Sequence, residues 1–254
     1  MKRTFYQLMF ILFTPLVICQ TSNEFIAKGD DYNKKFDLKN AAKYYEEAYK
    51  ISSDSYYALL KITKIYNDLG EDYNENKDED GAENAFNIAL KYAKEFSSKF
   101  PDSAKVYTLL AMSYGNLALF EGGNSKLKLA YLIRDNAVKA IEKDSSDYLP
   151  YIILSIYNRQ IASLNWFERA FANTFFGKVP DGSLKESERL MLKSLKIEPG
   201  IVTAMYQLSL TYKEMGNEQK EIEWLKKVLD APITDFRDKY AKRKSKDRLS
   251  ELNN

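Results

Sequence analysis

The chain has 254 residues, of which 45% are hydrophobic, 38 are Lys or Arg and 36 are Asp or Glu. A chain of this length and apolar content can bury a core, which excludes both a disordered protein and a small disulfide-stapled fold. It has no histidine and a single cysteine. A histidine general base and a zinc site built from several Cys or His ligands are therefore excluded, and at most one thiol nucleophile is available. Glycine (10) and proline (6) are scarce, which favours helices joined by short loops over a turn-rich β protein.

Residues 1–19 are typical of a secretory signal peptide. Lys2 and Arg3 form a positive start, and an apolar stretch follows over residues 8–18. That stretch is shorter than the about 20 apolar residues that a membrane span requires. We therefore predict an exported protein, periplasmic or secreted, with no stable transmembrane segment after cleavage.

The position of signal-peptide cleavage determines whether the mature chain keeps its single cysteine. Cleavage before Gln20 removes Cys19 together with two basic residues, and leaves 36 basic residues against 36 acidic ones. The alternative is a membrane-anchored lipoprotein acylated at Cys19, although Ile18 is bulkier than the residue such processing prefers. A net charge of zero lacks the basic excess of a nucleic-acid-binding protein, so we expect no nucleic acid as partner.

Residues 20–232 are predicted to form about five helical hairpins of tetratricopeptide type, which repeat at about 34 residues. In such a hairpin, small residues let two helices pack closely and large residues fill the space beside them. The fold class is therefore an all-α, tetratricopeptide-like solenoid with inserts. The first unit follows the pattern well, with Phe25, Gly29, Tyr32, Ala41, Tyr45 and Ala48.

The second unit predicts a longer hairpin. Its two helices carry Leu59, Thr63 and Tyr66, then Ala82, Phe86 and Ala89. Tyr66 and Ala82 are sixteen residues apart, seven more than the pattern requires. Seven residues are about two helical turns, so we expect the hairpin to lengthen without a change of its buried face.

The spacing of polar residues over residues 72–83 raises the hypothesis of a calcium-binding loop. Oxygen-bearing side chains stand at positions 1, 3, 5, 7, 9 and 12 of an EF-hand-like loop: Asp72, Asn74, Asn76, Asp78, Asp80 and Glu83. Lys77 occupies the position where that loop needs glycine. We therefore favour a helix start, capped by Asp80 with Glu83 as its capping-box partner, and predict no metal or cofactor.

The remaining units match less regularly. The third has a turn over residues 121–124, and the fourth has an insert over residues 161–185 with an aromatic helix, Trp166–Phe176, which we expect to stack on units four and five. Residues 233–254 are predicted to be a capping helix that covers the last hydrophobic face. The pattern residues of the third unit are Tyr107, Ala111, Tyr114, Ile133, Ala137 and Ala140, and those of the fourth are Tyr151, Leu154, Ser155, Ser187, Met191 and Ser194. Those of the fifth are Met205, Ser209, Tyr212, Gly216, Leu225 and Val228. In the fifth unit Glu221 stands at a position where the pattern has a small residue.

From about Tyr56 to Leu252 the chain resembles the regulator of microtubule dynamics family of tetratricopeptide proteins. The segments that carry this resemblance are Phe120-Glu121-Gly122, Lys126, Ala130-Tyr131, Asn136 to Asp144, Trp166, Arg169, Ala172, Val179-Pro180, Ser183, Ile197-Glu198-Pro199-Gly200, Leu208, Thr211-Tyr212, Trp224-Leu225 and Pro232. The resemblance implies a helical-repeat fold without known catalysis and, in named members, association with microtubules or organelle membranes. The apparent export signal and the additional repeat at residues 25–48 depart from it, so microtubule binding is not expected here.

The inner face of the repeats is the predicted binding surface. Positions 2, 5, 9, 12 and 13 of each first helix point there in the pattern. They predict a groove for an extended peptide or a helix, in which the end helix or the insert could alternatively lie. The groove residues are Tyr57, Leu60, Lys64, Asn67, Lys105, Thr108, Met112, Asn116, Ile152, Arg159 and Tyr206. The same pattern positions also include Ile26, Asp30, Lys34, Ile156, Gln160 and Lys213.

The sequence thus predicts a non-enzymatic scaffold that binds a peptide, a protein or an envelope component. It contains no GxSxG, P-loop or GxGxxG motif. Two alternatives stay open: a glycan-acting enzyme that uses a pair of carboxylates, and a structural subunit of an envelope complex.

Overall fold

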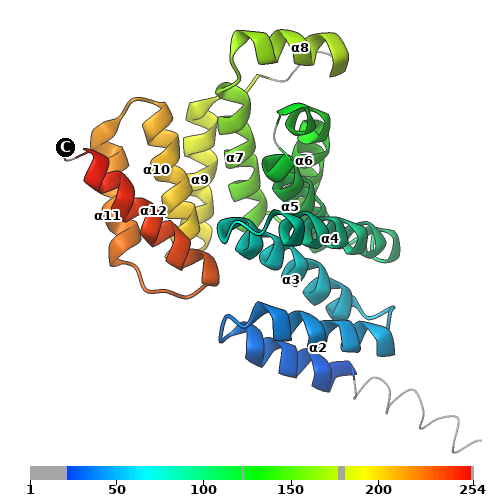
Figure 1. Cartoon of the computed structure of the whole chain (residues 1–254). Coiled ribbons are helices and arrows are strands. Elements are labelled where there is room, and N and C mark those ends of the chain that lie inside the picture. The colour runs from blue at the N-terminus through cyan, green and yellow to red at the C-terminus, as the bar shows by residue number, and fades with distance from the viewer. Residues whose placement is uncertain (1–21, 122, 177–180, 253–254) are drawn as a thin grey trace, which may run out of the picture. The chain divides into compact units, whose positions relative to one another are not determined.

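The computed structural model describes residues 22–121, 123–176 and 181–252 (Figure 1). Within these ranges the regular elements are all helices, which confirms the all-α prediction. The predicted signal peptide at residues 1–19, with Cys19, lies outside the described residues. No helix in the described ranges is long and apolar enough to cross a membrane.

The chain forms two compact units. The first comprises the residues up to Tyr73 together with Asp78–Pro101, and the second comprises Asn74–Lys77 together with the residues from Asp102 onward. The first unit contains a helix over residues 22–33, followed by α2 (Leu38–Ile51), α3 (Tyr56–Glu75) and α4 (Glu79–Lys99). These helices are the first two predicted hairpins.

The two hairpins of the first unit share one type of turn. Phe36 (φ 60°) and Lys77 (φ 66°) each end the first helix in the left-handed conformation. The next residue, Asp37 or Asp78, starts the second helix by accepting a hydrogen bond from a backbone N–H three residues later. The predicted cap at Asp80 is therefore wrong by two residues, because α4 already begins at Glu79.

The structure also corrects the register of the second hairpin. A β-carbon on Gly29 would lie 2.4 Å from a ring carbon of Tyr45, and one on Gly70 would lie 2.4 Å from ring carbons of Phe86. Each glycine stands sixteen residues before its ring, and the second pair follows the first by 41 residues. Gly70, not Thr63, is therefore the small residue at the close approach, and the extra residues extend the start of α3 and the end of α4.

The second unit stacks three further hairpins. The helices are α5 (Ala104–Glu121), α6 (Gly123–Lys143), α7 (Leu149–Ala162), α8 (Trp166–Phe176), α9 (Leu184–Ile197), α10 (Val202–Glu214), α11 (Glu218–Asp230) and α12 (Phe236–Leu252). The first helices of successive hairpins touch, because α5 contacts α7 and α7 contacts α10. Each first helix also packs against the second helix of its own hairpin.

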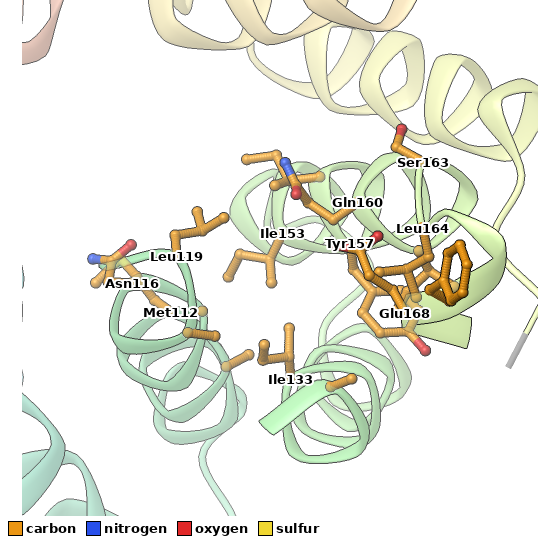
Figure 2. A pocket seen from close by; sticks show the side chains of 17 residues that line it. Met112, Asn116, Leu119, Ile133, Ile153, Tyr157, Gln160, Ser163, Leu164 and Glu168 are labelled. Atoms are coloured by element: carbon orange, nitrogen blue, oxygen red, sulfur yellow. The ribbon is translucent and has the colours of Figure 1, made fainter. Parts of the chain in front are cut away.

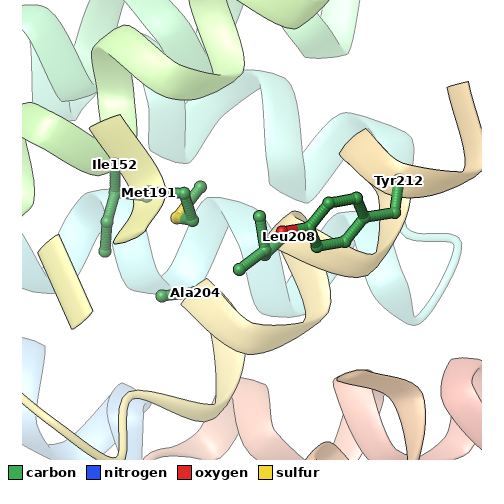
Figure 3. Close-up of a cluster of buried hydrophobic side chains, with 5 residues drawn as sticks. All are labelled: Ile152, Met191, Ala204, Leu208 and Tyr212. Atoms are coloured by element: carbon green, nitrogen blue, oxygen red, sulfur yellow. The ribbon is translucent and has the colours of Figure 1, made fainter. Parts of the chain in front are cut away.

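Apolar and hydroxyl side chains hold neighbouring hairpins together. Ile152, Met191, Ala204, Leu208 and Tyr212 form a buried cluster between α7, α9 and α10 (Figure 3). Beside the cluster, the hydroxyls of Ser155, Ser187 and Thr211 allow close helix approach and have hydrogen-bond partners there. Ser155 Oγ donates to the carbonyl of Ser187 at 2.7 Å, and the hydroxyls of Ser187 and Thr211 are 3.1 Å apart.

The end helix α12 packs against α10 and α11. Ala241 of α12 joins Val202 and Val228 in a buried cluster. Glu221, the acid at a position where the pattern has a small residue, is 3% exposed and lies 2.7 Å from Arg248 Nε of the same end helix. The cation of α12 thus balances a buried carboxylate of α11, which explains how the fold tolerates it.

Candidate functional site

A cavity of about 520 Å³ lies within the second unit, bounded by α5, α6, α7 and the start of α8 (Figure 2). Its lining is mostly apolar. The lining residues are Ala111, Met112, Gly115, Asn116, Ala118, Leu119, Ala130, Ile133, Ile153, Ile156, Tyr157, Gln160, Ile161, Ser163, Leu164, Phe167 and Glu168. Pockets of about 300–1,000 Å³ lined chiefly by apolar residues are the usual size and kind for ligand sites.

Four residues of the predicted inner face line this cavity. Met112 and Asn116 come from α5, and Ile156 and Gln160 come from α7. They occupy pattern positions that face inward in two successive hairpins, and the contact between α5 and α7 brings them together. The structure therefore places part of the predicted groove around one cavity.

Small residues of α5 create the space. Ala111, Gly115 and Ala118 recur at helical spacing on the side of α5 that lines the cavity. A β-carbon added to Gly115 would meet no atom within 4 Å, in contrast to the glycines at the close helix approaches of the first unit. The cavity exists because no large side chain of α5 fills it.

Helix α8 forms one end of the cavity. Its start is fixed by a reciprocal capping pair, in which Glu168 N donates to Asn165 Oδ1 at 3.0 Å and Asn165 N donates to Glu168 Oε2 at 2.9 Å. Arg169 also donates to the carbonyl of Ile161 at 3.0 Å, which ties the helix to the end of α7. Glu168 is therefore already engaged within the chain.

The aromatic side chains at the start of α8 are not buried as expected. Trp166 and Phe167 are 73% and 76% exposed, with their ring centroids 4.8 Å apart. The described contacts of the helix are with α6 of the third hairpin and, through the Arg169 hydrogen bond, with the end of α7 of the fourth. The prediction that it stacks on unit five as well is wrong, because a short connection holds it beside the end of α7.

Two predicted groove residues of α5 serve the packing of the hairpins. Thr108 Oγ1 donates to Asp147 Oδ2 at 3.0 Å, and Lys105 Nζ lies 3.0 Å from the same oxygen. Asp147 and Thr108 are buried. These contacts join the start of α5 to the loop before α7.

Three further groove residues are engaged inside the second unit. Arg159 is 6% exposed, and its guanidinium donates to Glu214 Oε1 at 3.2 Å and to Gln207 of α10. Burial lowers the pKa of Arg159, which the carboxylate of Glu214 opposes. Ile152 lies in the buried cluster of Figure 3, and Tyr206 packs against the cluster that α12 completes.

The remaining groove residues belong to the first compact unit. Tyr57 is 62% exposed, Lys64 is exposed and Leu60 is half-buried. Asn67 is fully buried, and its amide donates to the carbonyl of Thr63 at 3.0 Å. Its place in the core makes Asn67 a structural residue of α3.

Tyr157 is a lining residue that the repeat pattern does not predict. It follows the inward position Ile156, and it is 7% exposed. Its hydroxyl is buried without a hydrogen-bond partner in the described structure, and burial raises its pKa. The pattern of a single repeat cannot indicate this residue, because its burial depends on the neighbouring hairpin.

The site offers little for catalysis. Among the described residues that line the cavity, Glu168 is the one carboxylate, whereas glycoside hydrolysis generally requires a facing pair. Among the described residues, no group of three or more Asp, Glu, His or Cys side chains is placed to hold a metal ion. The arrangement is suited to binding an apolar group.

Comparison with known proteins identifies the family. The family model described as regulator of microtubule dynamics protein 1-3 matches residues 20–253 and so includes the first hairpin, which the resemblance from Tyr56 had left out. Regulator of microtubule dynamics protein 1 of Bos taurus is 26% identical over 59% of this chain and 48% of its own length. Regulator of microtubule dynamics protein 3 of Xenopus laevis is 27% identical over 68% of this chain and 37% of its own length.

The chain thus spans about half or less of the length of these curated relatives. Among solved structures, a thermophilic tetratricopeptide-repeat protein of Thermus thermophilus superposes with a TM-score of 0.62 at 14% identity, over 88% of this chain and 98% of its own. This likeness shows that the fold is a tetratricopeptide-type helical repeat. Together with the family match over residues 20–253, it establishes that the chain belongs to the regulator of microtubule dynamics family.

Proposed function

We propose that this chain is an exported, non-enzymatic scaffold that binds a protein or peptide partner on the inner face of its second compact unit. The observation that carries the proposal is the convergence of Met112, Asn116, Ile156 and Gln160 around one cavity. These residues are inward positions of two successive hairpins. Stiff helical repeats display such side chains in a fixed arrangement, so that binding costs little ordering entropy.

The chemistry of the inner face supports recognition rather than catalysis. Apolar side chains supply contact area, and Asn116 and Gln160 place polar side chains among them at the same surface. Glu168, the carboxylate among the described lining residues, caps α8. This chemistry favours binding over the glycan-acting enzyme.

Export is proposed from the sequence of residues 1–19, which matches a signal peptide in charge and apolar length. It places the partner in the periplasm, in the medium or on the envelope. The names of the relatives make microtubules a second candidate partner, and the two candidates require different compartments.

A capture experiment with matched baits tests the proposal. The full chain is compared with Asn116→Arg/Gln160→Arg, which places two cations on the inner face, and with Lys226→Glu, a charge change on an exposed residue of α11. We expect an envelope protein to bind the wild-type and Lys226→Glu baits and to be lost from the double variant. Equal capture by all three baits contradicts the inner-face site.

Localisation and tubulin binding are measured separately. Fractionation of the source cells should recover the chain outside the cytoplasm with a mass that lacks residues 1–19. Co-sedimentation with purified microtubules should leave it in the supernatant. A cytoplasmic chain that sediments with microtubules would overturn the export proposal in favour of the second candidate.

A further inference from the structure

We propose that the cavity of the second unit is a binding site for a small, uncharged apolar molecule, such as a long-chain alcohol or ester. Met112, Asn116, Ile156 and Gln160 line this cavity and also belong to the inner face proposed above to bind a protein, so the two proposals share one surface. The probe titration below and the capture experiment above use different ligands, so each proposal fails on its own result.

The walls provide an apolar environment on several sides. Ile133 of α6 and Ile153 of α7 lie between Met112 and Leu119 of α5 on one side and Leu164 on the other (Figure 2). Phe167 of α8 also lines the cavity. Several of these side chains are nearly buried even though they border open space: Ala111, Ala118, Ala130, Ile133, Ile153 and Ile161. An apolar cavity of this kind binds apolar ligands because water inside it would find few polar partners.

The charges of the lining determine the class of ligand. Among the described residues of the lining there is no lysine or arginine, so a carboxylate or phosphate would have no counter-charge from them. A cation would have to compete for Glu168, which is engaged in capping α8. Figure 2 shows Asn116 at one end of the lining and Ser163 and Glu168 at the other, with Ile133 and Ile153 between them. This arrangement suits an elongated apolar body without a formal charge.

The glycine at position 115 also indicates that the space beside α5 is kept open. A glycine inside a helix costs about 0.5–1 kcal/mol of stability relative to alanine. Gly115 has neither a positive φ nor a close neighbour that would require it. What its missing side chain provides is room in the cavity.

The first measurement uses N-phenyl-1-naphthylamine, an uncharged probe whose fluorescence rises in apolar sites. Titration of the full chain should give saturable enhancement with one site per chain. Dodecan-1-ol should displace the probe, whereas dodecanoate, with the same number of carbons and a negative charge, should displace it at least about tenfold less effectively. Equal displacement by the two would overturn the uncharged class, and an absence of saturable binding would overturn the site.

A cavity-filling variant locates the site. Gly115→Phe should weaken probe binding at least about tenfold, while Lys226→Ala should bind as the wild type does. The melting temperature of Gly115→Phe should equal or exceed that of the wild type, because the new ring enters open space. If that variant melts lower, Gly115→Leu provides the same test with a smaller side chain. Unchanged binding by a folded filling variant contradicts the assignment to this cavity.

Discussion

Gly70 and the ring of Phe86 are in such close contact that a β-carbon on residue 70 would lie 2.4 Å from two ring carbons. Phe86 is 2% exposed, and side chains in a close-packed protein interior have little room to shift. The same relationship joins Gly29 to Tyr45 in the preceding hairpin. The pair Gly–aromatic therefore sets the distance between the two helices of each hairpin in the first compact unit.

The close approach predicts opposite effects for two glycine substitutions. Gly70→Ala should lower the free energy of unfolding by about 2–3 kcal/mol, because overpacking a buried ring costs this much. Gly115→Ala should raise it by about 0.5–1 kcal/mol, because alanine is the better helix former and meets no atom there. Urea unfolding of both variants measures the difference. A destabilised Gly115→Ala would contradict the open space beside α5.

The left-handed turns predict a second pair of opposite effects. Lys77 adopts φ 66° with a side chain, while Gly216 adopts φ 69° without one. Lys77→Gly should stabilise the protein by up to about 1 kcal/mol. The left-handed conformation costs a non-glycine residue about 1–2 kcal/mol, and removal of this cost is partly offset because glycine loses more backbone entropy on folding. Gly216→Ala should destabilise it by about 1 kcal/mol. Thermal melts of the two variants should shift in opposite directions.

Two tyrosines should respond differently to loss of the hydroxyl. The Tyr157 hydroxyl is buried without a partner, so Tyr157→Phe should raise the free energy of unfolding by about 1 kcal/mol. Tyr45 Oη donates to Asp30 Oδ1 at 2.6 Å, so Tyr45→Phe should lower it by about 1.5–2 kcal/mol. Chemical denaturation provides the comparison. A loss of stability in Tyr157→Phe would indicate that the hydroxyl has a partner in solution.

Stability should depend on pH through Glu188. Tyr212 Oη donates to its carboxylate at 2.6 Å, and this hydrogen bond holds the pKa of Glu188 below its usual value of 4.5, with help from Lys220 at 3.2 Å. A lowered pKa in the folded state means that the ionised form stabilises the fold above pH 4.5, and that this contribution is lost as the pH falls through the folded pKa. Glu188→Gln should therefore be less stable than the wild type near neutral pH, and the difference should shrink in acid.

Sequence patterns predicted what depends on a single hairpin. The Ala41–Tyr45–Ala48 spacing lies within α2, and the inward positions 112, 116, 156 and 160 follow from helix periodicity alone. These predictions needed no knowledge of neighbouring hairpins. They correctly predicted the fold class, while the binding role of the inward positions stays a prediction.

The remaining features depend on residues distant in the chain. Arg159 was predicted to bind a ligand, but its partner Glu214 is 55 residues away, on α10. The burial of Glu221 depends on Arg248 of the end helix, and the position of α8 depends on a hydrogen bond between Arg169 and the α7 backbone. A repeat pattern says nothing about such pairs, because they differ from one hairpin to the next.

Site-specific crosslinking tests the central claim, that the inner face of the second unit binds a partner, most directly. A photo-reactive phenylalanine is placed at Gln160, which lines the cavity, and in a second chain at Lys226, which is exposed on α11. Both chains are expressed in the source cells and illuminated. We expect one defined crosslinked partner from position 160 and none of that mass from position 226. The same product from both positions, or a product from position 226 alone, would contradict it.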